Sequence, residues 1–134
     1  ENTETENTLR VDKSKSPQLI LRFDDITYPV DAWVEPSTKH IERAFSFWEN
    51  TNKQSVLIHC HMGISRSSGI ALAIIAKELG PGREQEAVKI LEIINPYCAP
   101  NALVVWLADE LLSRGGKLYR TAEKHVPFTG SYRG

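Results

Sequence analysis

The feature that most constrains this chain is residues 55–69, Ser-Val-Leu-Ile-His-Cys-His-Met-Gly-Ile-Ser-Arg-Ser-Ser-Gly. Its first four residues are mostly apolar and include β-branched types, which predicts a buried strand over 55–58. The run 67–79 is rich in Ala and Ile and lacks Pro, which predicts a helix. A loop between a strand and a helix N-terminus binds anions, because unpaired N–H groups and the helix dipole face it. Cys60 lies in this loop, so we expect the loop to bind phosphate and Cys60 to attack it.

Composition and charge restrict the partners. The chain has 134 residues, enough for one domain that buries roughly two-thirds of its unfolded surface. Lys and Arg number 16 against 17 Asp and Glu, so there is no overall basic field. We therefore expect neither a nucleic-acid partner nor a membrane-surface partner.

Cysteine content and hydropathy indicate the compartment. Two cysteines, Cys60 and Cys98, are too few for a disulfide scaffold and predict reduced thiols. No apolar run approaches the ~20 residues that span a bilayer, and no signal-peptide pattern opens the chain. We expect a cytoplasmic protein. The sequence does not indicate its oligomeric state.

The domain organisation is simple. Residues 1–8 have no apolar side chain, which predicts a flexible tail. The globular domain is predicted over 9–120, and residues 121–134 are predicted to form a loosely ordered C-terminal tail.

Periodicity along the domain predicts strands followed by helices. A short edge strand is expected at 9–11 and a largely buried strand at 18–23. Ser37 or Thr38 is a candidate N-cap for the first helix. Besides the run after the central loop, helices are predicted over about 38–52, 83–94 and 101–114. Gly80-Pro81-Gly82 predicts the stop of the helix after the central loop, and Asn95-Pro96 predicts the end of the helix over 83–94. Apolar strands alternating with helices predict an α/β fold, a central and mostly parallel sheet flanked by helices.

The residues of the central loop suit phosphoryl transfer. Gly63 permits a backbone turn that a β-carbon would obstruct. Arg66 supplies a permanently charged fork for two phosphoryl oxygens. The loop N–H groups that hold a phosphate also stabilise a thiolate, so we expect a lowered pKa at Cys60. Ser67 is placed to donate a hydrogen bond to the sulfur and to make it a better leaving group.

The spacing His59-Cys60-(five residues)-Arg66-Ser67, with Gly63 inside it, resembles the signature of cysteine-based protein tyrosine phosphatases. The length, and a Pro-Asn pair at 100–101, resemble the small dual-specificity branch. The amino-acid sequence around the motif most resembles the bacterial members of that branch. The resemblance covers about residues 18–115. It implies an enzyme that hydrolyses phosphate monoesters through a cysteinyl-phosphate intermediate.

The resemblance also implies roles for individual residues. The implied catalytic residues are Cys60, Arg66, Asp25 and Ser67. The implied phosphate-binding residues are His61, Met62, Gly63, Ile64, Ser65 and Arg66. The implied supporting residues are His59, which orders the loop, and Asn101, for which bracing of the loop and a plain helix N-cap are both open.

The general acid is expected on the loop upstream of the nucleophile. By the register of the family it is Asp25, which would protonate the leaving oxygen and then deprotonate the attacking water. Asp24 is the alternative acid, although its carboxylate would also suit capping of a turn. Asp31 is a third and weaker choice.

The resembled fold usually has a strand–helix–strand unit before the acid loop. Residues 9–23 are too few for three elements, so we expect a form of the fold shortened at its N-terminus. The four histidines do not have metal-ligand spacing and no C-x-x-C is present, so we expect no metal and no cofactor.

The expected substrate is a phosphorylated protein or a small phosphate ester. Between Cys60 and Arg66 the loop has no Lys, whereas phosphoinositide-selective relatives place Lys there. This favours phosphotyrosine, with phosphoserine and phosphothreonine as alternatives, over polyphosphorylated lipids. Two other classes remain open, a non-catalytic phosphate-binding module and a rhodanese-like sulfurtransferase, although the sulfurtransferase has no use for the upstream Asp pair.

Overall fold

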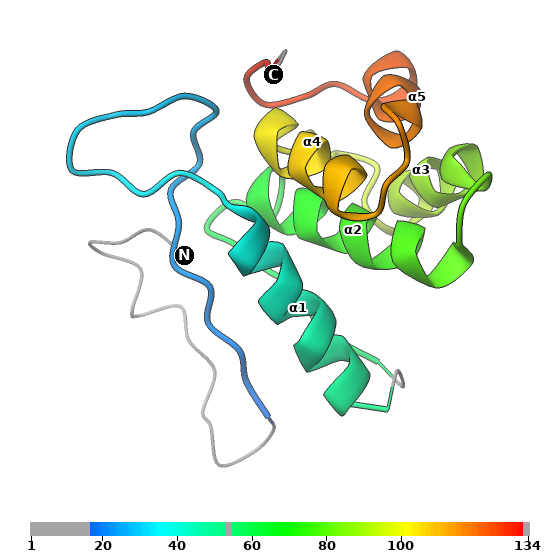
Figure 1. The fold of residues 1–134 in the computed structure, drawn as a ribbon, viewed down its shortest axis with the longest axis horizontal. Coiled ribbons are helices and arrows are strands. Elements are labelled where there is room, and N and C mark those ends of the chain that lie inside the picture. The colour runs from blue at the N-terminus through cyan, green and yellow to red at the C-terminus, as the bar shows by residue number, and fades with distance from the viewer. Residues whose placement is uncertain (1–16, 53–54, 133–134) are drawn as a thin grey trace.

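The computed structural model describes residues 17–52 and 55–132. The predicted tail at 1–8 and the predicted edge strand at 9–11 lie outside these residues. The described part of the chain forms five helices: α1 (Thr38–Asn50), α2 (Arg66–Leu79), α3 (Glu84–Ile94), α4 (Ala102–Leu111) and α5 (Lys117–His125) (Figure 1).

The predicted central sheet is wrong. Residues 17–52 and 55–132 contain no strand, and an isolated parallel bridge between Asn101 and Thr129 is the one β-type pairing among them. The segments 18–23 and 55–60 have no regular secondary structure. A strand exists only where a neighbour completes its ladder of hydrogen bonds, and apolar β-branched residues do not supply that neighbour. Leu57 is 82% exposed, so its apolar side chain does not mark a buried strand.

Helix α2 is the centre of the molecule, and it packs against α1, α3 and α4 (Figure 1). Most of its residues are buried, including Leu72 and Ala73. At Gly69 an added Cβ would lie 2.7 Å from Cγ1 of Val104, so the absent side chain lets α4 approach closely. The end of α2 at Gly80, where φ is +89°, matches the Gly-Pro-Gly stop in the sequence.

Local caps determine where α1 and α4 begin. Ser37 is the N-cap of α1, and its backbone N–H donates to Nδ1 of His40 at 3.0 Å. Asn101 is the N-cap of α4, and its Oδ1 accepts from the backbone N–H of Val104 at 3.0 Å. Helix α1 buries Ile41 among other apolar residues, at the spacing expected for one face of a helix.

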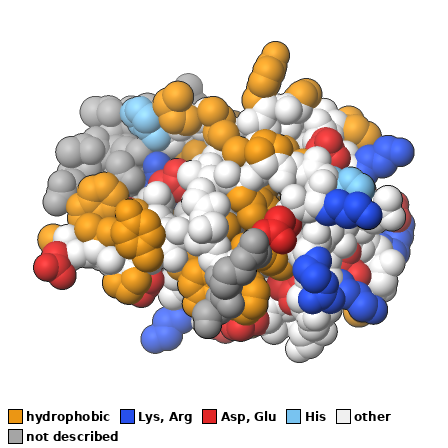
Figure 2. Space-filling view, turned by 90° about the horizontal axis from the view of Figure 1, so that it is seen from above, with side chains coloured by type: hydrophobic (Ala, Val, Ile, Leu, Met, Phe, Trp, Pro, Cys, Tyr) orange, Lys and Arg blue, Asp and Glu red, His pale blue; other side chains and the backbone are white. Residues whose placement is uncertain are grey.

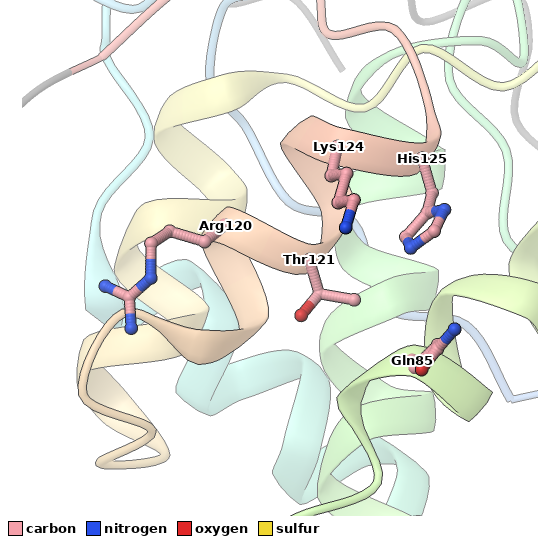
Figure 3. Close-up of a pocket in the computed structure, with 5 residues that line it drawn as sticks. All are labelled: Gln85, Arg120, Thr121, Lys124 and His125. Atoms are coloured by element: carbon pink, nitrogen blue, oxygen red, sulfur yellow. The ribbon is translucent and has the colours of Figure 1, made fainter.

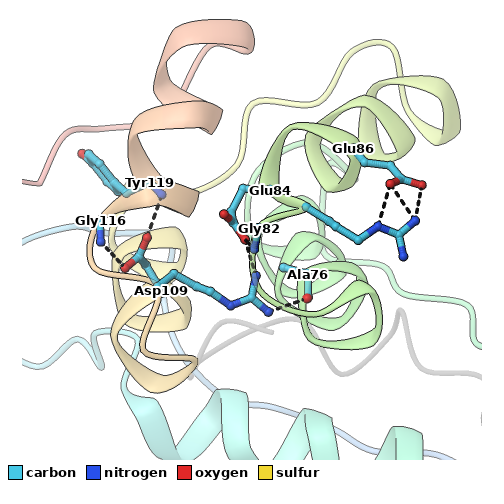
Figure 4. Close-up of polar contacts among 9 residues, drawn as sticks. Ala76, Gly82, Glu84, Glu86, Asp109, Gly116 and Tyr119 are labelled. Atoms are coloured by element: carbon cyan, nitrogen blue, oxygen red, sulfur yellow. Dashed lines mark hydrogen bonds and ion pairs between the residues drawn. The ribbon is translucent and has the colours of Figure 1, made fainter.

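A buried ion pair and a carboxylate cap connect α2, α3, α4 and α5 (Figure 4). Arg114 follows α4, and its Nη1 lies 2.6 Å from Oε2 of Glu84 on α3. Its Nη2 donates to the carbonyl of Ala76 on α2 at 2.6 Å. The carboxylate of Asp109 accepts from the backbone N–H of Tyr119 at 3.0 Å, which ties the first turn of α5 to α4.

Helix α5 is absent from the sequence-based prediction. Leu118 and Ala122 are fully buried on its inner face, against α3 and α4. Beyond α5 the chain turns back along α4: the ring of Tyr132 lies 5.4 Å from that of Trp106. In the described part of the chain no helix has the length and apolar content that crossing a bilayer requires.

Candidate active site

Cys60 lies directly before the loop that leads into α2. Its Sγ is 3.3 Å from Oγ of Ser67, in the first turn of the helix. Its thiol is partly buried and free of any disulfide. The side chain therefore faces the helix N-terminus, where partial positive charge favours an anion.

The surroundings of Cys60 favour its thiolate. Burial alone would raise the pKa of Cys60, but several contacts outweigh it and lower that pKa below the ordinary value. These contacts are hydrogen bonds from the side chain and backbone of Ser67, a backbone hydrogen bond from Gly63, and the positive charge of Arg66. Cys98, by contrast, is buried and its pKa is raised, first by burial and then by the charge of Glu92.

Three successive carbonyls of the loop bond to one segment, residues 95–101. The Gly63 carbonyl accepts from Nδ2 of Asn95 at 2.8 Å. The Ile64 carbonyl accepts from the Ala99 N–H at 3.0 Å, and the Ser65 carbonyl from the Asn101 N–H at 3.1 Å. In a trans peptide the N–H points opposite to the C=O, so the next three N–H groups point away from this segment. This arrangement leaves successive N–H groups able to bind an anion.

Asp25 is held beside the same loop. Its Oδ1 accepts from the Ser65 hydroxyl at 2.7 Å and from Nδ2 of Asn101 at 2.9 Å. Asn101 therefore caps α4 through Oδ1 and contacts the upstream loop of Asp25 through Nδ2 in the same conformation, whereas bracing of the phosphate loop by its side chain stays a prediction. Nδ2 also donates to the Ile26 carbonyl at 3.1 Å, which fixes the backbone after Asp25.

Asp24 and Asp25 have different surroundings. Asp24 is buried, and its Oδ2 accepts from the backbone N–H of Val34 at 2.8 Å. The Asp24 N–H donates to the Val34 carbonyl at 2.7 Å, so these two residues close the loop between them. Asp25 is exposed, as is Asp31 farther along the loop. The carboxylate of Asp24 is thus used to hold the loop, whereas that of Asp25 faces the phosphate-binding candidate residues.

The Arg66 side chain lies beneath the acid loop. It is buried, and its Nη1 donates to the Phe23 carbonyl at 3.1 Å. Its charge is one of the causes of the lowered pKa of Cys60. The guanidinium therefore acts on Cys60 through its charge and on the backbone of Phe23 through a hydrogen bond.

The other predicted loop residues form its outer rim. His59, His61 and Met62 are exposed, with Met62 at 71%. The His59 ring forms no side-chain hydrogen bond with another described residue, so the predicted ordering role of His59 stays a prediction.

Two contacts at the site are missed by sequence reasoning. Asn95 appears in the sequence only as a helix stop, although its amide binds the Gly63 carbonyl. Ser65 is predicted to bind phosphate, but no pattern indicates its hydrogen bond to Asp25, forty positions upstream. Within residues 17–52 and 55–132 no group of three or more His, Cys, Asp or Glu residues is arranged to hold a metal ion.

The chain is similar to curated protein phosphatases. It is 36% identical over 102 residues to Protein phosphatase Slingshot homolog 3 of Rattus norvegicus, which covers 72% of this chain and 15% of the relative. The same-named protein of Mus musculus is 35% identical over 79 residues, or 55% of this chain and 12% of the relative. Dual specificity protein phosphatase YVH1 of Plasmodium falciparum is 34% identical over 74 residues, or 54% of this chain and 13% of the relative.

The chain thus spans less than a sixth of the length of these relatives. No family model matches it, and no solved structure matches it. The similarities support the cysteine-based protein tyrosine phosphatase superfamily, on the dual-specificity side. The closer likeness to bacterial members stays a prediction.

Proposed function

We propose that this chain hydrolyses phosphate monoesters by transfer of the phosphoryl group to Cys60. The observation that supports this most is the pairing of a thiol whose pKa is lowered with a carboxylate from the upstream loop that is held beside the loop after Cys60. Cys60 Sγ lies 3.3 Å from Oγ of Ser67, and Asp25 is held by Ser65 and Asn101. The similarity to protein phosphatases supports the same reaction class.

In the first step the Cys60 thiolate attacks phosphorus. An S–P bond forms, the bond from phosphorus to the leaving oxygen breaks, and Asp25 donates a proton to that oxygen. Asp25 Oδ1 already accepts two hydrogen bonds, whereas Oδ2 accepts none from another described residue, so Oδ2 is the oxygen that holds the transferable proton. The loop N–H groups and Arg66 stabilise the charge on the phosphoryl oxygens.

In the second step water attacks the cysteinyl-phosphate. Asp25, now a carboxylate, takes the proton from this water, an O–P bond forms, and the S–P bond breaks to release phosphate. The thiolate leaves with its negative charge. The Cys60 thiol donates to Oγ of Ser67 in the structure, and the same hydroxyl would donate to the departing thiolate, which makes Cys60 a better leaving group.

The proposed substrate is a protein or small molecule with a single phosphoryl group. The loop has no Lys to hold further phosphates, and it exposes the apolar side chain of Met62. An aromatic phosphate ester suits an apolar rim, because ring and rim bury apolar surface together. Phosphotyrosine is therefore our first choice, with phosphoserine and phosphothreonine as alternatives.

The test is hydrolysis of a generic aryl phosphate by the unaltered chain and four variants. Cys60→Ser should abolish turnover, and vanadate should inhibit the unaltered chain. Asp25→Asn should lower kcat by about 10²–10⁴-fold, because general acid–base catalysis contributes that much. Cys98→Ala is the matched thiol control and should retain activity, and Asp24→Asn is the matched control for the acid.

Three results would change the proposal. Binding of a phosphopeptide without any turnover would indicate a phosphate-binding module. Transfer of sulfur from thiosulfate to cyanide would indicate a sulfurtransferase. Loss of activity in Asp24→Asn with retention in Asp25→Asn would exchange their roles.

A further inference from the structure

A polar hollow lies far along the chain from Cys60, between α3 and α5 (Figure 3). Its volume is about 290 Å³, and it is lined by Gln85, Arg120, Thr121, Lys124 and His125. Every lining side chain can donate a hydrogen bond, and none is a carboxylate or an apolar group. Figure 3 shows Lys124, Thr121 and His125 projecting from α5 on the side that faces Gln85 of α3.

Positive charge is concentrated on this part of the molecule. The whole chain has a formal net charge of −1, yet α5 reads Lys-Leu-Tyr-Arg-Thr-Ala-Glu-Lys-His. Figure 2 shows Lys and Arg side chains gathered toward the right-hand end, where Figure 1 places α3 and α5. The charge of α5 is therefore opposite in sign to that of the whole chain.

The carboxylates nearest in sequence to Gln85 are already paired. Glu84 is buried against Arg114, 2.6 Å from its Nη1. Glu86 lies 2.6 Å from Nη2 of Arg83. No ion pair joins Arg120 or Lys124 to a carboxylate within the described ranges. The cations of α5 are thus available to a ligand.

The N-terminus of α3 adds to the attraction for an anion. Gln85 is the second residue of α3, so the hollow adjoins the positive end of that helix dipole. Lys124 and His125 lie in the last turn of α5, whose dipole has the opposite polarity there. The attraction for an anion therefore comes from the N-terminus of α3 and from the side-chain donors of α5.

We propose that this hollow between α3 and α5 binds a phosphate monoester group, separately from Cys60. A phosphoryl group has several oxygens, and these can accept from the lysine, the hydroxyl, the amide and the imidazole together. Nucleic acid is the poorer fit, because no Phe, Tyr or Trp side chain lines the hollow for base stacking. A membrane surface is also the poorer fit. Electrostatic attachment to anionic lipids relies on clusters of about 4–8 Lys or Arg residues, each of which contributes about 1 kcal/mol.

The experiment is a titration of the isotope-labelled unaltered chain with inorganic phosphate, followed by backbone and His side-chain NMR signals. We expect saturable shifts at Gln85, Thr121, Lys124 and His125, with a dissociation constant on the order of millimolar for so exposed a site. Shifts at Gly63 to Ser67 report the other site and are read separately. Failure of one proposal is thus distinguishable from failure of the other.

Variants make the test specific. Lys124→Gln should weaken phosphate binding at the hollow by about threefold to tenfold, as expected for one charged hydrogen bond near the surface. Lys117→Gln removes the same charge from the same helix outside the hollow and should leave binding unchanged. Both variants should retain aryl phosphate hydrolysis.

Three outcomes would overturn the proposal. Absence of saturable shifts at α5 would remove the site, and equal weakening by both variants would reduce it to diffuse surface charge. The third outcome is that the chain binds vesicles of phosphatidylcholine and phosphatidylserine but not phosphate, and that Lys124→Gln abolishes the vesicle binding. This result would assign the surface to membranes instead.

Discussion

Helices α2–α5 and the segments that form the candidate active site are held together by different forces. The helices bury large apolar side chains, such as Leu72, and enclose the ion pair of Glu84 with Arg114. The site segments 24–34 and 60–65 contain no helix or strand, and hydrogen bonds join Asp25 to Ser65 and to Asn101 at the start of α4. Each such hydrogen bond has a net stabilisation of about 1 kcal/mol, whereas a fully buried leucine gives about 2–3 kcal/mol. Global stability and the geometry of the site should therefore respond to different substitutions.

The largest effect on stability is expected at the buried ion pair. Arg114→Met leaves Glu84 charged and without its guanidinium partner, which should lower the free energy of unfolding by about 3–5 kcal/mol. Urea denaturation followed by circular dichroism measures this change. Arg83→Met, in the exposed pair with Glu86, is the matched control and should change it by less than about 1 kcal/mol. Equal losses in both variants would contradict the importance of burial.

The next largest effect on stability is expected at a buried leucine, with an exposed leucine as its control. Leu72→Ala removes a fully buried side chain from α2 and should cost about 2–5 kcal/mol. Leu57→Ala removes a side chain that is 82% exposed and should change stability by about 0.5 kcal/mol or less. The same denaturation experiment compares them. A large loss from Leu57→Ala would show that residues 55–58 are packed after all.

A smaller effect on stability, with a larger one on activity, is expected at Asn101. Asn101→Ala removes the cap of α4 and both contacts to the acid loop, which should lower stability by about 1–2 kcal/mol. Asn101→Asp keeps an acceptor for the Val104 N–H but removes the donor to Asp25 and adds a like charge beside it. It should therefore retain the stability of the α4 cap more fully than Asn101→Ala and still slow aryl phosphate hydrolysis. Full activity in Asn101→Asp would exclude a positioning role.

The smallest change concerns the titration of Cys60. The folded chain lowers this pKa, so the thiolate persists to a lower pH than in an unfolded chain. The pH profile of iodoacetamide alkylation should have its midpoint below that of a free thiol, about 8.5. Ser67→Ala removes a donor to the sulfur and should move the midpoint upward. A midpoint that Ser67→Ala leaves unchanged would contradict the role of this contact.

Sequence reasoning predicts the elements whose signals are local. The Ser37 cap, the Gly80 stop and the start of α4 at Asn101 each depend on one or two neighbouring residues, and α1 to α4 appear close to their predicted limits. Helix α5 takes its cap from Asp109, a carboxylate of another helix that no local pattern indicates, although Leu118, Tyr119 and Ala122 do fall at helical spacing. The sheet depends on partners that an apolar run cannot specify, and the prediction of it was wrong.

The candidate site divides in the same way. The sequence motif places Cys60, Gly63 and Ser67 on one loop before a helix, because their spacing is short. The contacts of Asp25 with Ser65 and Asn101 span 40 and 76 positions, and only tertiary structure brings these residues together. The predicted roles of these residues stay predictions until the chemistry is measured.

The most direct test of the central claim is to trap the covalent intermediate. Asp25→Asn should slow the second step as well as the first, so rapid quenching during turnover of an aryl phosphate should leave phosphate on part of the protein. Mass spectrometry of the digested chain should locate that phosphate on the peptide with Cys60 and not on the peptide with Cys98. Continued release of phosphate without any phosphorylated Cys60, in this variant and in the unaltered chain, would contradict nucleophilic catalysis by Cys60.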